Sequence, residues 1–282
     1  MTKSAVRAMD AVQEFVKEET GLEVENFTVT GGSKRGWTTW LTGAADKRAN
    51  AIAPIVIDVL NMQPQMEHQL EAWGKYSEMI DDYTRMGIQL AADSPAGRNL
   101  NAIVDPYSYR DRLTQPKLIV IATNDRYWPL DALDLYWDDL AGPKYVMYVP
   151  NHGHGVADVP RLIGSISSLH RMASGDLPYP ELDWDLTTAG DKLSLKLTSD
   201  VEPSKVVAWV ATSETRDFRD AKWKSYPTTA SEGGYRYEID VPSQGYAAMF
   251  GEAVYDHGGL NAYLSTNVKI VGGAGTAVGG QE

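Results

Sequence analysis

The first 176 residues combine buried strands with amphipathic helices. Two continuous apolar runs, at 117–123 and 144–149, are typical of strands that are buried on both faces of a sheet. Apolar residues also recur at helical spacing over 1–18 and again over 156–172. Strands that alternate with helices favour a parallel sheet covered by helices, so this pattern predicts an α/β core over 1–176.

The pattern changes after a short linker at 175–180 that contains two prolines. Beyond it, short strand-like runs replace the helical spacing. These runs lie at 193–197, 206–211, 235–241 and 263–271. Several short strands separated by turns predict a small all-β, sandwich-like domain over 181–271. The glycine-rich end of the chain, 272–282, is predicted to be disordered.

A segment rich in tyrosine, methionine, glutamine and acidic residues, at 61–114, interrupts the core. We expect it to be helical and, because it connects two sheet strands, to cover the carboxyl edge of the sheet as a lid or substrate wall. Four of its residues recur at helical spacing: Trp73, Tyr76, Met79 and Tyr83. Such a stripe indicates ordinary packing more often than a substrate platform. Another helix is expected at about 131–140.

The most informative chemical signal is a serine that follows a strand-like run at 27–30 and two glycines, Gly31 and Gly32. A serine on a sharp strand-to-helix turn is how α/β-hydrolases present their nucleophile, and the strained turn requires small neighbours. The common signature is Gly-x-Ser-x-Gly. Around Ser33 the last glycine falls one residue late, at Gly36. Taken alone, the motif also fits an inert serine in a glycine-rich turn.

An acid and a base follow the serine in the chain order that α/β-hydrolases use. Asp125 follows one buried strand and His154 follows the next, so both lie at carboxyl strand ends, where such sheets place functional groups. A serine hydroxyl needs an imidazole to take its proton, and the imidazole needs a carboxylate to orient it. Two alternatives remain: His152 as the base, and Asp58, at the end of a predicted strand over 51–59, as the acid. We favour His154 because small residues surround it.

Composition narrows the possible partners and chemistry. The net charge of −12 and a pI near 4.9 argue against nucleic acid and anionic membranes as partners. No apolar run is long enough to span a membrane. The absence of cysteine excludes disulfides and thiol chemistry, and the 5 histidines show no spacing typical of a metal site. We therefore expect no metal and no cofactor, and a small molecule or peptide as substrate.

Four segments of the chain resemble the PhoPQ-activated pathogenicity-related proteins: 32–40, 53–62, 105–110 and 148–155. The resemblance is close from residue 1 to about 175. It implies an α/β-hydrolase fold and an exported protein, periplasmic or extracellular, and it identifies no substrate. Carried onto this sequence, it points to Ser33, Asp125 and His154. Where the family pattern has a small residue before Gly-His, this chain has His152.

The serine lies much earlier in the chain than in a complete α/β-hydrolase. Only 32 residues precede Ser33, too few for the strands that usually come before the nucleophile. We therefore expect the chain to be the carboxyl-terminal portion of a family member. The nucleophile strand would then lie at an exposed sheet edge, and weak activity and aggregation are expected.

The backbone N–H of Lys34 is the predicted oxyanion donor, and the loop that normally supplies a second amide is expected to be missing. The late glycine also resembles the Ser-x-x-Gly elbow of glucuronoyl esterases, in which a basic residue beside the serine helps to hold the oxyanion. Lys34 and Arg35 are candidates for that role, although a solvated helix surface explains both residues better.

Together these residues predict a serine hydrolase that cleaves an ester or a peptide bond through an acyl-enzyme. In this hypothesis Ser33 attacks the acyl carbon, His154 moves the proton and Asp125 orients the imidazole. The alternative hypothesis is a secreted binding or signalling protein without enzymatic activity, built on a hydrolase scaffold, because a fold does not fix a function.

Overall fold

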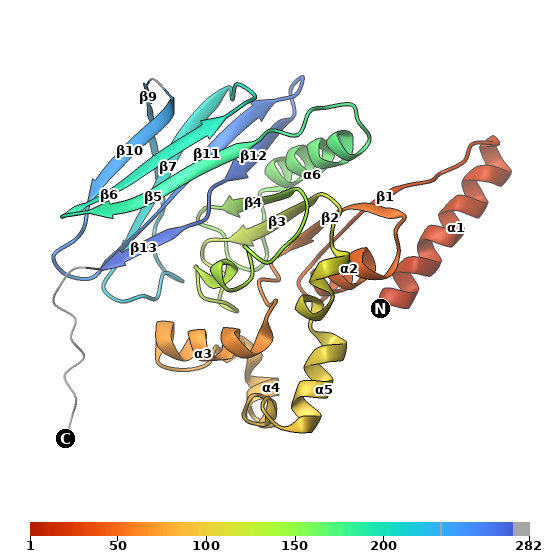
Figure 1. Ribbon diagram of the computed structural model, residues 1–282, viewed down its shortest axis with the longest axis horizontal. Helices are drawn as coiled ribbons and strands as arrows, with labels where there is room; N and C mark the ends of the chain where they lie inside the picture. Colours follow the sequence, from red (N-terminus) through yellow and green to blue (C-terminus); the bar gives the residue numbers. More distant parts are fainter. Residues whose placement is uncertain (232, 273–282) are drawn as a thin grey trace.

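The computed structural model describes residues 1–231 and 233–272 as a mixed α/β fold with two sheets (Figure 1). The larger sheet contains β1 (Phe27–Gly32), β2 (Ala49–Ile55), β3 (Lys117–Ala122), β4 (Lys144–Val149), β7 (Lys205–Ser213), β8 (Lys224–Pro227), β11 (Tyr246–Asp256), β12 (Asn261–Ser265) and β13 (Lys269–Gly272). The smaller sheet contains β5 (Leu182–Ala189), β6 (Lys192–Ser199), β9 (Thr229–Ser231) and β10 (Gly234–Asp240). The fold class predicted from the sequence is confirmed.

Strands β1 to β4 form the parallel part of the larger sheet, in chain order. Strand β4 has the bounds that the apolar run predicted, and β3 ends one residue earlier than expected. Strand β2 ends before the predicted limit, so Asp58 lies in the loop beyond it. Among the described residues, β1 is hydrogen-bonded to β2 alone and forms an edge of the sheet, as expected.

Helices cover both faces of the parallel strands. The helices that pack around this sheet are α1 (Thr2–Thr20), α2 (Lys34–Ala45) and α6 (Val159–Ala173). Because side chains of a strand alternate between faces, Ile119 of β3 joins the apolar cluster that contains Trp40 of α2. Its neighbour Leu118 joins the cluster that contains Leu169 of α6. Helix α1 lies outside α2, at the edge of the molecule (Figure 1).

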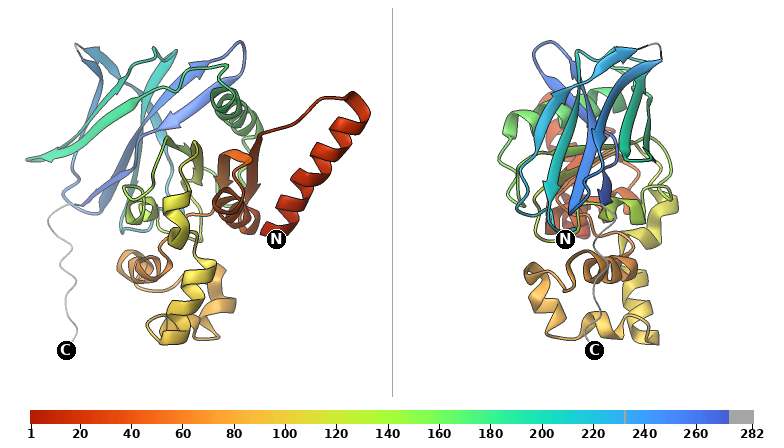
Figure 2. Two further views of the ribbon diagram at one scale, coloured as in Figure 1. Left: turned by 45° about the vertical axis from the view of Figure 1, so that its right-hand side comes forward. Right: turned by 90° about the vertical axis from the view of Figure 1, so that its left-hand side faces the viewer.

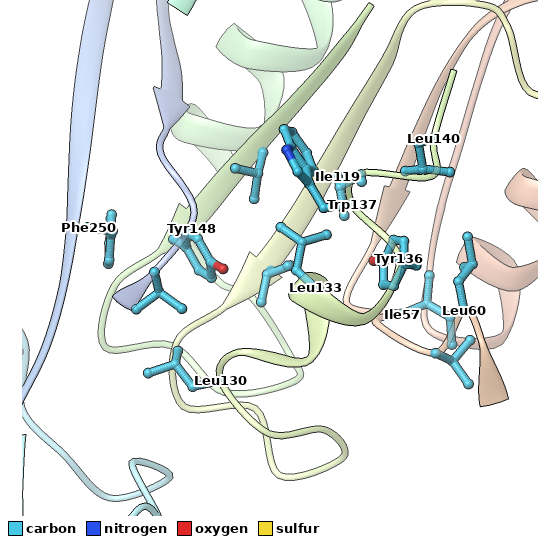
Figure 3. Packing of buried hydrophobic residues seen from close by; sticks show 14 of the residues in the cluster. Ile57, Leu60, Ile119, Leu130, Leu133, Tyr136, Trp137, Leu140, Tyr148 and Phe250 are labelled. Atoms are coloured by element: carbon cyan, nitrogen blue, oxygen red, sulfur yellow. The ribbon is translucent and has the colours of Figure 1, made fainter. Parts of the chain in front are cut away.

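The prediction of an α-helix at about 131–140 is wrong. This segment contains one short 3-10 turn, η4 (Ala132–Leu135), among turns. Large apolar residues in and just before this segment recur at helical spacing, and Leu135 is half-buried. Five others are buried in the cluster on the α2 face: Leu130, Leu133, Tyr136, Trp137 and Leu140. Figure 3 shows them spread beneath the strands, toward Tyr148 and Phe250. The segment follows the sheet surface instead, and the carbonyls of Ala132 and Leu135 accept hydrogen bonds from the side-chain amides of Gln65 and Asn61, at 3.1 and 2.9 Å, rather than from a helical backbone.

The predicted insertion is helical. It contains α3 (Met62–Trp73), η1 (Glu78–Ile80), α4 (Asp81–Thr84), η2 (Ile88–Ala91), α5 (Pro95–Val104) and η3 (Pro106–Arg112). We call residues 62–104 of it the cap. In Figures 1 and 2 the cap helices form a group at one end of the molecule, and the smaller sheet lies at the opposite end.

The strands after residue 181 divide between the two sheets. Strand β12 pairs antiparallel with β4, so the larger sheet continues from parallel into antiparallel strands in the order β1-β2-β3-β4-β12-β11-β7-β8, with β13 also on β11. The smaller sheet, in the order β5-β6-β10-β9, packs against it through Leu193, Leu195 and Leu197 in one shared apolar cluster. The two packed sheets resemble a sandwich, and one of its layers is the larger sheet, which also contains the parallel strands β1 to β4. The predicted division into units at 1–176 and 181–271 therefore stays a prediction.

Two details of this region differ from the sequence pattern. The run at 263–271 is interrupted and belongs to β12 and β13. The pattern also missed β11, the longest strand of the larger sheet, because its alanines, glycine and methionine have low strand propensity. Apart from Gly272, the tail predicted to be disordered, 272–282, lies outside the described residues.

Candidate active site

Ser33 occupies a strained turn between β1 and α2. Its backbone angles are φ 55° and ψ −124°, a combination that L-residues rarely adopt. The Ser33 N–H donates to the carbonyl of Ile55, 2.8 Å away, which fixes the turn to β2. This strained conformation, predicted from the motif, holds the side chain at the carboxyl end of the parallel sheet.

The glycines around Ser33 differ in whether the structure leaves room for a side chain. A Cβ at Gly31 would lie 2.8 Å from the Cβ of Arg35, and a Cβ at Gly36 would lie 2.6 Å from Cγ2 of Ile57. Both positions therefore exclude a side chain, which explains the glycine that falls one residue late. A Cβ at Gly32 would meet no atom within 4 Å. The expectation that Gly32 must be small is wrong, because that position faces open space.

The structure brings Ser33, His154 and Asp125 into one hydrogen-bonded chain. The Ser33 Oγ lies 2.7 Å from Nε2 of His154, and Nδ1 of the same ring lies 2.8 Å from Oδ2 of Asp125. A carboxylate only accepts, so the network assigns the proton to Nδ1 and leaves Nε2 to accept from the serine hydroxyl. The Asp125 side chain is 8% exposed and that of His154 is 26% exposed, so the carboxylate is shielded while the imidazole remains accessible.

Tyr127 contacts both Asp125 and His154. Its backbone N–H donates to Oδ1 of Asp125 at 3.0 Å, which occupies the oxygen that His154 does not use. Its ring packs on the imidazole of His154, with 4.1 Å between ring centroids and 31° between the planes. The sequence analysis missed Tyr127, although its position two residues after the acid is typical of an Asx turn.

The two alternative residues, His152 and Asp58, do not join the hydrogen-bonded series of Ser33, His154 and Asp125. Nδ1 of His152 lies 2.9 Å from the carbonyl oxygen of Pro150. Asp58 accepts a 2.7 Å hydrogen bond from the hydroxyl of Tyr136, and its side chain is buried. Burial raises the pKa of Asp58 to about 7. His154 and Asp125 are therefore the residues that the geometry joins to Ser33.

A loop of the carboxyl-terminal region, residues 214–223, supports the two loops that carry Asp125 and His154; we call it the support loop. The side-chain amide of Asn124, beside the acid, donates to the carbonyl of Ala221 at 2.7 Å. The side chain of Asn151, near the base, exchanges two hydrogen bonds with the backbone of Trp223, at 2.7 and 3.0 Å. These asparagines were missed because their partners lie far away in the chain.

A cavity of about 390 Å³ opens beside Ser33 and His154. Its walls come from the elbow helix, the loops after β2 and β3, and the cap. The apolar and aromatic residues that line it are Trp37, Ile57, Val59, Met62, Met66, Met79, Ile80, Tyr83, Ile88, Ala92, Tyr127 and Trp128. Of the stripe predicted to be packing, Met79 and Tyr83 line the cavity, whereas the ring of Trp73 lies 4.2 Å from the guanidinium of Arg219.

The amino end of α2 adjoins the cavity. The helix begins at Lys34, whose backbone N–H belongs to the first turn and has no acceptor within the helix. The partial positive charge of this helix end favours a developing oxyanion. The side chains of Lys34 and Arg35 are exposed, and Lys34 also lines the cavity.

Metal-binding groups and membrane-spanning helices are both absent from the described part of the chain. Residues 1–231 and 233–272 contain no group of three or more histidine, aspartate and glutamate side chains that could hold a metal ion. Within the same residues, no helix is long and apolar enough to cross a membrane.

Comparison with known proteins agrees with the sequence motifs. Autocrine proliferation repressor protein A from Dictyostelium discoideum is 38% identical over 279 residues, which cover 90% of this chain and 56% of that protein. The chain thus spans about half the length of the curated relative that it matches.

Solved structures of hydrolases are more distantly similar. An acetyl xylan esterase from Paenibacillus sp. R4 is 20% identical with a TM-score of 0.43, over 59% of this chain and 50% of that one. An acylaminoacyl peptidase from Pyrococcus horikoshii is 17% identical with a TM-score of 0.37, over 53% and 23%. Residues 1–219 match the family described as PhoPQ-activated pathogenicity-related protein, and the chain belongs to that family.

Proposed function

We propose that this protein is a serine hydrolase that cleaves an ester or peptide bond through an acyl-enzyme. The observation that supports the proposal is the hydrogen-bonded chain from Ser33 through His154 to Asp125, at 2.7 and 2.8 Å. The strained backbone of Ser33 and the cavity beside its hydroxyl are further support, because a structural serine requires neither.

In the first half of the reaction, Oγ of Ser33 attacks the acyl carbon while its proton passes to Nε2 of His154. The carboxylate of Asp125 holds the imidazole in the productive tautomer and stabilises the imidazolium. The oxygen of the tetrahedral intermediate accepts a hydrogen bond from the backbone N–H of Lys34. Collapse of the intermediate breaks the bond to the alcohol or amine, which leaves with the proton from His154.

In the second half, water attacks the acyl-enzyme and gives a proton to the same imidazole nitrogen. The intermediate then breaks the bond to Oγ, the carboxylic acid leaves, and the proton returns to Ser33. The ring of Tyr127 limits rotation of the imidazole through both halves, because it covers one face of His154. No further reactant is required besides water.

Active-site labelling with diisopropyl fluorophosphate tests this proposal. The serine oxygen displaces fluoride, so intact-mass spectrometry reports one phosphoryl adduct. We expect the adduct in the parent chain and in the control Ser174→Ala, and none in Ser33→Ala. His154→Gln should lower the labelling rate by about 10³-fold or more, whereas His152→Gln should not change it. Equal labelling of Ser33→Ala and the parent would refute the proposal.

A second candidate is a secreted signalling or binding protein that has no enzymatic role. The name of the Dictyostelium discoideum relative, Autocrine proliferation repressor protein A, favours it. The two candidates differ in one measurement, because a signalling protein would keep its effect on cell proliferation in the Ser33→Ala variant. The enzyme hypothesis instead requires that Ser33→Ala abolish both labelling and any effect of the protein on cells.

A further inference from the structure

The walls of the cavity beside Ser33 are rich in methionine and aromatic side chains. Three methionines, Met62, Met66 and Met79, and several aromatic rings line it. Methionine side chains are flexible and polarisable, so they adapt to apolar ligands of different shape. Two cap residues that line the cavity, Ile88 and Met79, are 39% and 43% exposed. These apolar side chains therefore face the opening rather than filling it.

The charges around the cavity exclude a charged substrate group in its interior. Apart from His154, the ionisable lining groups among the described residues that carry charge are Lys34 and Asp82. Both are exposed to solvent. A charged group bound among the apolar walls would therefore lose its hydration without gaining a buried partner, which is costly. The remaining polar side chains of the walls are uncharged: Gln63, Thr84, Gln89 and Asn101. The chemistry of the walls therefore fits a neutral, mostly apolar group.

The volume gives the size of that group. At about 390 Å³, the cavity falls within the range of 300–1,000 Å³ in which protein pockets bury whole small-molecule ligands. An acetyl group would leave most of it empty. The cavity begins at Ser33, so it can receive a group that is attached to the carbonyl carbon that the serine attacks.

We infer that the cap forms an acyl-binding pocket, and that the substrate is a neutral ester with a medium-length alkyl or an aromatic acyl group. This inference rests on the proposed function, and it names the substrate class of the same site. Residues of the cap, Met66, Met79 and Ile88, determine its specificity, while Ser33 and His154 perform the chemistry. The alcohol part of the ester lies outside the cavity and is selected weakly.

A series of p-nitrophenyl esters tests the pocket: acetate, butyrate, hexanoate, octanoate and decanoate. Each methylene that is buried in the transition state should raise kcat/KM about fourfold until the cavity is full. Ile88→Trp should fill part of the cavity and lower the octanoate-to-acetate ratio of kcat/KM about tenfold or more. The matched control is Leu90→Trp, two residues further on, because Leu90 is 81% exposed and does not line the cavity. It should leave the ratio unchanged.

Binding gives a readout that is independent of turnover. Trp37 and Trp128 line the cavity, so n-octanol should change the tryptophan fluorescence of Ser33→Ala, and Ile88→Trp in the same background should weaken octanol binding. A second variant, Ile88→Ala, should shift the preference toward longer esters; urea unfolding of each variant verifies its fold.

The two proposals fail in different ways. If diisopropyl fluorophosphate labels Ser33 but acetate is the best ester and Ile88→Trp leaves the ratio unchanged, the acyl pocket is refuted and the hydrolase is not. If Ser33 is not labelled, the hydrolase is refuted, and octanol binding to Ser33→Ala then shows an apolar ligand site without catalysis. Labelling together with a rising ester series that Ile88→Trp reverses supports both.

Discussion

Replacing Asp58 by asparagine should remove the loss of stability that ionisation of this one buried side chain causes between acid and neutral pH. Asp58 is buried beneath the active site, where Oδ1 accepts a hydrogen bond from Tyr136 and Oδ2 has no partner among the described residues. Burial raises its pKa from 3.8 to about 7. The nearby carboxylates of Asp134, Asp125 and Asp131 add to this increase, and the Tyr136 hydroxyl opposes it.

The magnitude follows from linkage between protonation and folding. Between about pH 4 and pH 7, folded Asp58 keeps its proton while the unfolded chain has released it, so the free energy of unfolding falls as pH rises. One pKa unit corresponds to about 1.36 kcal/mol. The shift from 3.8 to about 7 therefore costs about 4 kcal/mol, complete above pH 7 and absent below pH 4. Asparagine has the same shape, accepts from Tyr136 and cannot ionise.

Urea unfolding of the parent and of Asp58→Asn at pH 4, 6 and 8 measures the effect. The difference in free energy of unfolding, variant minus parent, should increase by about 4 kcal/mol from pH 4 to pH 8. Groups common to both proteins cancel in this difference. Tyr136→Phe removes the hydrogen bond that opposes the shift, so its stability loss should extend to higher pH. A variant-minus-parent difference that stays constant with pH would show that Asp58 ionises normally and that the reasoning is wrong.

Three further sets of variants test other parts of the structure by urea unfolding or by ester turnover. Gly36→Ala should lower the free energy of unfolding by about 1–3 kcal/mol through overpacking, whereas Gly32→Ala should have almost no effect. Arg161→Met should cost about 3–5 kcal/mol because it leaves the buried Glu252 carboxylate without its partner, and adding Glu252→Gln should recover most of that loss. Asn124→Ala should lower kcat more than it changes KM, and an unchanged kcat would contradict the positioning role of that amide.

The sequence predicted the parts of the site that depend on local pattern. Ser33 follows a short strand and a glycine turn, and Asp125 and His154 each follow a continuous apolar run, so strand ends alone placed them at one sheet edge. The sequence favoured His154 over His152 because small residues surround it, and in the structure Nε2 of His154 lies beside Ser33 whereas His152 lies beside the Pro150 carbonyl.

Features that depend on distant contacts were not predictable in the same way. The segment 130–140 has helical spacing but forms turns, because side chains of the distant residues Asn61 and Gln65 bind its backbone carbonyls. The pairing of β12 with β4 joins residues 119 positions apart, Val146 and Ser265, and no local pattern encodes it. The support loop likewise contacts the active site through backbone carbonyls, which carry no sequence signal.

The support loop links the carboxyl-terminal strands to the geometry of the candidate active site. Asn124 and Asn151 anchor the two halves of the site to backbone between β7 and β8, so the angle between acid and base depends on a ribbon far along the chain. Recombining the first 176 residues with strands from another protein would therefore produce a chimera whose imidazole is misaligned. An exchange that keeps residues 214–223 together with β7 and β8 would retain the hydrogen bonds to Asn124 and Asn151.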